Sequence, residues 1–105
     1  MGVFDQREKA FETKYFMDQD LEFTILVRRD KLFGIWAAQH AGLTGEAAQA
    51  FVRDVIDTEI VTHSVLHKVF LDLTALGVDV TEAELKVKLL EMHETAREQI
   101  YKEHG

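Results

Sequence analysis

Apolar side chains recur at spacings of three and four residues along most of this 105-residue chain. Such spacing places them on one face of an α-helix, because the helix completes a turn every 3.6 residues. The chain also contains no proline, which is the strongest breaker of helices. Helix is therefore the predicted state of nearly the whole chain.

After the first twenty residues, residue types typical of helix ends indicate where one helix stops and the next one begins. Asp18 or Asp20 is suited to cap a helix that we expect to stop at Gly42, because glycine enters the left-handed conformation without steric penalty. Thr44 follows as the predicted N-cap of a second helix. Residues between Thr58 and Ser64 are rich in β-branched side chains, which weaken a helix, and we expect a turn there.

The last helix has the clearest start. Thr81 and Glu84 occupy the two positions of a capping box, and Val80 and Leu85 occupy those of a hydrophobic staple. A third helix precedes this boundary, and we expect it to end near Gly77.

Each predicted helix has one apolar face. In chain order these faces consist of Ile25, Leu26, Leu32, Phe33 and Trp36; Ala48, Phe51, Val52, Val55 and Ile56; Val65, Leu66, Val69, Phe70 and Leu73; and Leu85, Leu89, Met92, Ala96 and Ile100. Four such helices joined by short loops bury their faces most simply in an antiparallel bundle. We predict an all-α fold, with a four-helix antiparallel bundle over residues 20–105.

Residues 1–19 form a separate amphipathic segment. Phe4, Phe11 and Tyr15 recur at helical spacing among charges of both signs, and Asp5 is placed to cap a helix reaching about Met17. The periodicity leaves two alternatives. The helix packs its aromatic side chains on its own bundle, or it docks them in a groove of a partner while its charges set the register.

Composition narrows the classes of function. The chain has 19 acidic and 12 basic residues, a net charge of −7, which argues against a nucleic-acid binder. Its apolar stretches are far shorter than the ~20 residues that span a bilayer, and we expect a cytoplasmic protein without membrane insertion. The absence of cysteine excludes disulfides and thiolate metal sites.

Two histidines raise the question of a metal site. His63 and His67 are four residues apart and would share a helix face, with Glu59 one turn before. The residues between them lack the glutamate of a zinc-hydrolase motif, and the sequence specifies no distant third ligand, so we predict no metal site. We also predict no enzymatic activity, because the acids lie mainly on polar faces and Ser64 lacks a nucleophile elbow.

A basic cluster precedes the single tryptophan. Arg28, Arg29 and Lys31 could receive a phosphate, with Trp36 as a stacking surface for a base. A solvated basic face beside a core tryptophan is favoured instead, because the chain has no glycine-rich phosphate loop. Binding of ATP or ADP at Arg28, Arg29 and Trp36 stays open, and no other cofactor is expected.

Three sequence blocks carry a family resemblance. They are FDQREKAFETK at 4–14, RRDKLFGIWAA at 28–38 and TGEAA at 44–48. In this order and spacing they resemble the small zeta subunit of alphaproteobacterial F1Fo ATP synthases, and the likeness covers essentially the whole chain. Residues 57–68 depart from the family pattern.

The resemblance implies an inhibitor of ATP hydrolysis by the F1 sector, a four-helix bundle preceded by an inhibitory segment at residues 1–19. This segment would enter a catalytic interface between the alpha and beta subunits and reach the gamma rotor. The protein would be peripheral to the inner membrane when bound to F1. The partner-binding residues carried over from the family, extended by Tyr15 along the aromatic face, are Phe4, Arg7, Glu8, Phe11, Lys14 and Tyr15.

Two other functions remain as alternatives. Nucleotide binding has been associated with the family, so a cytosolic bundle that binds nucleotide or senses metabolic state is the main one. A paralogue that keeps the fold and binds another partner is the second.

Overall fold

The computed structural model describes residues 20–104, which form four α-helices and, within that range, no strand. The helices are α2 (Asp20–His40), α3 (Gly45–Val61), α4 (Val65–Ala75) and α5 (Glu82–His104). This confirms the all-α class. The predicted first helix, up to about Met17, lies outside the described residues.

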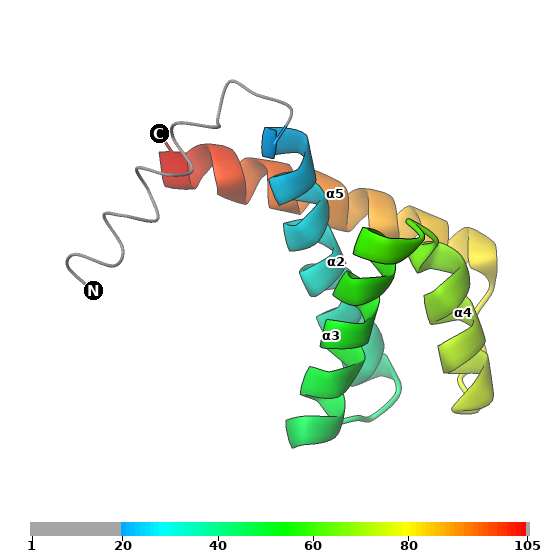
Figure 1. Cartoon of the computed structure of the whole chain (residues 1–105). Coiled ribbons are helices and arrows are strands. Elements are labelled where there is room, and N and C mark those ends of the chain that lie inside the picture. Colours follow the sequence, from blue (N-terminus) through cyan, green and yellow to red (C-terminus); the bar gives the residue numbers. More distant parts are fainter. Residues whose placement is uncertain (1–19, 105) are drawn as a thin grey trace.

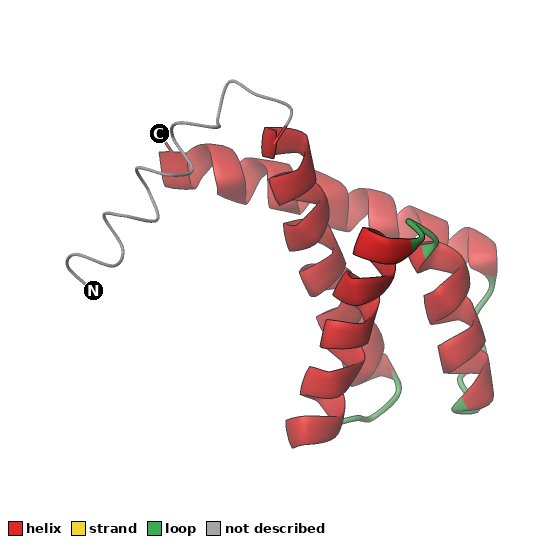
Figure 2. Cartoon of the chain, in the orientation of Figure 1, coloured by secondary structure: helices red, strands yellow, loops and turns green. Residues whose placement is uncertain are grey.

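The helices do not all share one direction. Figure 1 shows α2 and α3 side by side and running in opposite directions, α4 turning back again, and α5 running across the other three. Short loops join them (Figure 2). The antiparallel bundle is therefore not confirmed as a description of all four helices, because α5 crosses α2 instead of lying along it.

Both predicted glycine stops are confirmed. Gly42 and Gly77 have φ angles of 75° and 81°, in the left-handed region that glycine tolerates best. The residue after each glycine then donates its N–H back to the helix, over 2.9 Å from Leu43 to the carbonyl of Ala38 and over 2.9 Å from Val78 to Leu73. These bonds end α2 and α4.

The predicted start of α5 is also confirmed. The N–H of Glu84 donates to Oγ1 of Thr81 over 3.1 Å, and the N–H of Thr81 donates to Oε1 of Glu84 over 3.0 Å. Leu85 is fully buried, and Val80 packs against the same core. The capping box and the staple together fix where α5 begins.

The boundaries of α3 differ from two predictions. Thr44 stands at the N-cap, but its hydroxyl makes no capping hydrogen bond, because Gly45 follows in the left-handed region at φ 57°. The turn expected over Thr58–Ser64 is confined to residues 62–64. Thr58 donates its hydroxyl to the carbonyl of Asp54 over 2.8 Å, so a β-branched residue is accommodated inside the helix.

The core is divided into two clusters along α2. The larger one joins the second half of α2 to α3, α4 and the start of α5, and it contains Phe33, Ala37, Ala38, Phe51, Val55, Val65, Val69, Leu73 and Leu85. The smaller one joins the first half of α2 to the end of α5, through Ile25, Ala96 and Ile100. Most residues of the four predicted apolar faces belong to these clusters, but Leu26, Val52 and Ile56 do not.

Candidate functional site

The six predicted partner-binding residues lie outside the described residues. They are Phe4, Arg7, Glu8, Phe11, Lys14 and Tyr15. The described structure begins at Asp20, in α2, and this segment immediately precedes it in the chain. The roles of the six residues stay predictions.

Arg28 faces the end of α5. Its guanidinium group donates to both carboxylate oxygens of Glu103, over 2.7 and 3.0 Å, and to Oε1 of Gln99 over 2.9 Å. This two-pronged contact fixes the geometry of both partners. Arg28 therefore ties the first half of α2 to the last turns of α5.

Arg29 faces α3 instead. Its Nε donates to Oδ1 of Asp30 over 2.9 Å, and its Nη2 donates to Oε1 of Glu59 over 2.7 Å. Both carboxylates are buried, with exposed fractions of 0% for Asp30 and 2% for Glu59. Arg29 thus serves as the positive partner of two buried acids.

Trp36 lies next to a different part of α5. Its ring stacks on His40 at 4.9 Å and on Phe33 at 6.0 Å between centroids, and Nζ of Lys88 lies 5.5 Å from it. Arg28, Arg29 and Trp36 therefore contact three separate partners. A nucleotide bound to all three would have to displace carboxylates from both guanidinium groups, and such a site stays a prediction.

A groove between α2 and α3 was not anticipated from the sequence. It has a volume of about 630 Å³ and its lining includes Lys31, Ile35, Leu43, Val52 and Arg53. Lys31 is the member of the predicted basic cluster that lies along it. Periodicity placed Val52 on the inner apolar face of its helix but gave no sign of a groove beside it, because the groove depends on how α2 and α3 pack together.

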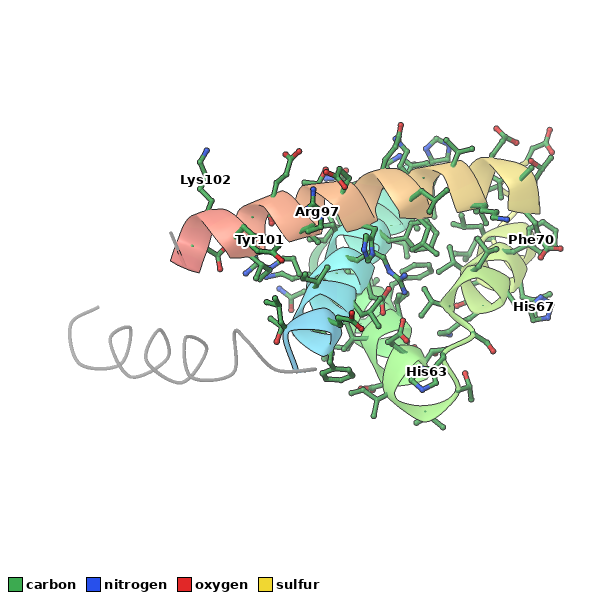
Figure 3. The ribbon with its side chains drawn as sticks, turned by 90° about the horizontal axis from the view of Figure 1, so that it is seen from above. His63, His67, Phe70, Arg97, Tyr101 and Lys102 are labelled. Carbon is green, nitrogen blue, oxygen red and sulfur yellow. The ribbon has the colours of Figure 1, made fainter. Side chains whose placement is uncertain are left out.

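The two histidines do not share a helix face, and that prediction was wrong. His63 stands in the turn with φ 61°, whereas His67 is exposed on α4, and Figure 3 shows them on different parts of the chain. Nδ1 of His63 lies 2.8 Å from Oε2 of Glu59. Among residues 20–104 no three potential ligands gather as a metal site would require.

His63, Glu59, Arg29 and Asp30 thus form one connected group, called here the Asp30 cluster. Sequence reasoning named Glu59 only as a possible metal ligand and did not anticipate the burial of either acid, although Asp30 stands three residues before Phe33 and Glu59 stands four residues after Val55 on the buried stripe. The position of each acid at the spacing of an apolar helix face was the signal in the sequence that could have indicated its burial.

Burial perturbs both acids of the Asp30 cluster. Loss of hydration and the neighbouring Glu59 raise the pKa of Asp30 to about 7, against the opposing effect of Arg29. Burial also acts to raise the pKa of Glu59. Hydrogen bonds to Asp30 and His63 and the charge of Arg29 outweigh it, and they hold the pKa of Glu59 below its usual value.

The sequence of the chain matches a known protein family. The model of the family described as ATPase inhibitor subunit zeta matches residues 1–99. The chain belongs to this family. The match covers the first segment as well as α2, α3, α4 and most of α5. Searches of curated proteins and of solved structures found no match.

Membership of the zeta family confirms the resemblance found in the sequence and supports an inhibitory role at the ATP synthase. An inhibitor subunit regulates a catalytic complex, in agreement with the predicted absence of enzymatic activity. In the part of this zeta-family chain that the structure describes, none of the helices has the length and apolar character to cross a membrane.

Proposed function

We propose that this zeta-family chain blocks ATP hydrolysis by inserting residues 1–19, as a helix, into an alpha/beta interface of F1. The segment reaches the gamma subunit there and stops rotation in the hydrolytic direction. The observation that carries the proposal is the extent of the family match, which includes residues 1–19 together with the helical domain. The protein acts in the cytoplasm and is peripheral to the inner membrane when bound.

The chemistry of the segment suits such insertion. Phe4, Phe11 and Tyr15 lie at helical spacing, and large aromatic side chains contribute most to affinity when a closing interface buries them. Charges such as Arg7 and Glu8 contribute more to orientation than to affinity. An isolated helix with so few large apolar residues is marginal in water, so we expect it to fold on binding.

The helical domain supplies a stable base for this segment. Both apolar clusters, with the partly buried residues packed on them, are built from residues 21–100. We therefore expect the domain to fold without the segment. The described part of α2 begins at Asp20, so this base follows residues 1–19 directly along the chain.

Deletion of residues 2–19 tests the mechanism. We expect the truncated chain to keep its helical circular dichroism and cooperative unfolding, because both core clusters remain, and to lose inhibition of F1 ATP hydrolysis. Hydrolysis by isolated F1 is measured against increasing concentrations of full-length and truncated protein. Full inhibition by the truncated chain would refute the insertion mechanism.

Point variants provide the matched control. Phe11→Ala removes a predicted anchor and is expected to weaken inhibition at least tenfold, since truncating a central buried anchor commonly costs about 2 kcal/mol or more. Lys9→Ala, two residues away and off the aromatic face, is expected to inhibit like the unmodified chain. Equal effects of the two substitutions would contradict the assignment of the aromatic face.

A further inference from the structure

The Asp30 cluster has an unbalanced charge. With both acids ionised and His63 neutral, two buried carboxylates face one guanidinium group, which leaves a net charge of −1. An uncompensated charge in the interior is costly because it has lost its hydration. One added proton brings the cluster to neutrality.

One carboxylate oxygen of Asp30 indicates where this proton binds. Oδ2 of Asp30 is buried and has no hydrogen-bond partner within residues 20–104, while Oδ1 accepts from Arg29. A buried acceptor without a donor carries its full desolvation cost. Protonation turns Asp30 into a hydrogen-bond donor that can share its proton with the carboxylate of Glu59. The same proton therefore removes the excess negative charge and gives the buried carboxyl group a hydrogen bond.

The charged groups that act on Asp30 come from two helices. Arg29 lies on the same helix, Glu59 lies on α3, and His63 reaches the cluster through Glu59. The main effects on the pKa of Asp30 come from its burial and from Glu59 and Arg29. The proton therefore acts at the contact between α2 and the end of α3.

We propose that the Asp30 cluster is a proton-binding site that holds the end of α3 and the following turn against α2. When the proton leaves, Asp30 and Glu59 repel each other and Arg29 neutralises only one of them. This repulsion weakens the contact of Glu59 with α2. In the described part of the chain, His63 is held to the cluster only through Glu59, its side chain is 69% exposed and its backbone is left-handed, so it moves together with Glu59. The turn at residues 62–64 therefore loosens first.

The direction of the pH effect follows from the two acids. Asp30 binds a proton more tightly in the folded chain, because its pKa rises from 3.8 to about 7. Its contribution to stability is complete below about pH 4 and is lost as the pH rises to about 7. Glu59 has a lowered pKa, so its contribution is lost only as the pH falls below its usual range, near 4.5. Between pH 5 and 7 the stability of this pair of acids therefore changes through Asp30, whose contribution declines as the pH rises.

Thermal unfolding of the full chain between pH 5 and 8 tests the site. We expect the Tm of the unmodified chain to fall by roughly 5 °C or more relative to that of Asp30→Asn over this interval. The asparagine keeps the shape and supplies a permanent donor, so its profile lacks the contribution of the proton. Glu22→Gln removes an exposed carboxyl group from the same helix and should follow the unmodified chain. Parallel profiles for Asp30→Asn and the unmodified chain would overturn the proposal.

Two further measurements keep the test decisive if Asp30→Asn fails to fold. The carboxyl carbon of Asp30, followed by NMR in the unmodified chain, should titrate near neutrality, and a midpoint near 4 would overturn the proposal. His63→Ala should retain the pH dependence, because the proton is assigned to Asp30. Loss of the dependence in His63→Ala would assign the proton to the imidazole instead. All of these experiments use the isolated chain, so their outcome is independent of F1 inhibition.

Discussion

At Gly34, α2 packs closely against the backbone of α3 at Val52. A Cβ atom added to Gly34 would lie 3.3 Å from Cα of Val52, closer than most real contacts, and the backbone of α3 cannot turn aside as a flexible side chain can. The glycine is therefore needed for space and not for an unusual backbone conformation.

Gly34→Ala should consequently destabilise the chain. Alanine favours helix over glycine by about 1 kcal/mol, but overpacking costs about 1–3 kcal/mol, and the helices must separate at their contact. We expect a net loss of about 1 kcal/mol in the free energy of unfolding, measured with urea. Gln39→Ala, exposed on the same helix, serves as the control and should change stability little. A gain in stability for Gly34→Ala would show that the contact is looser than described.

At the scale of single residues, periodicity predicted which apolar side chains are buried but not which charges join them. Phe33, Val55 and Leu85 were placed correctly because the 3.6-residue repeat fixes their face. The burial of Asp30 and Glu59 was missed because a carboxyl group is tolerated inside only when it meets a partner there, and the partner of Glu59 comes from another helix. That partner contact, from Arg29 to Glu59, joins residues thirty positions apart.

Among the elements, the two predicted threonine caps differ in what they contribute. Thr81 accepts from the N–H of Glu84 and donates its own N–H to that side chain, whereas the hydroxyl of Thr44 makes no capping bond. Sequence spacing identified both positions, but the backbone of the next residue decides whether the hydroxyl meets its donor. Gly45 prevents this at α3.

Thr81→Ala should therefore destabilise the chain more than Thr44→Ala. Loss of a working N-cap costs about 1 kcal/mol, with a range of about 0.5–2 kcal/mol, while removal of a hydroxyl that caps nothing should cost little. Urea unfolding of the two variants provides the comparison, each serving as the control for the other. Equal losses would mean that Thr44 caps α3 in solution.

The whole molecule shows what periodicity leaves undetermined. The repeat identifies the buried face of α5, from Leu85 to Ile100, but the angle at which this helix crosses α2 depends on how side chains of both helices interlock. The antiparallel bundle was the simplest arrangement of four apolar stripes. In the structure, α5 is long enough to pack against both clusters, with its first half on the larger one and its second half on the smaller one.

Ile100→Ala should increase local unfolding around the smaller cluster more than around the larger one. Ile100 is 1% exposed, and replacement of such a side chain by alanine costs about 2–5 kcal/mol. Because Ile100 belongs to the smaller cluster, amide hydrogen exchange should accelerate in residues 21–32 of α2 more than in residues 33–40. Leu90→Ala, on the exposed face of α5, should leave both regions protected. Equal acceleration along all of α2 would show that the two clusters unfold as one.

The first half of α2, which packs in the smaller cluster, connects the larger cluster to the segment that precedes α2. The conformation of this half determines the length of that connection. As helix, residues 21–32 span about 18 Å, and as an extended chain they span up to about 40 Å. Opening of the smaller cluster therefore more than doubles the distance between the larger cluster and the segment that precedes α2. How far the proposed inhibitory segment can reach from its base depends on the burial of Ile25, Ala96 and Ile100.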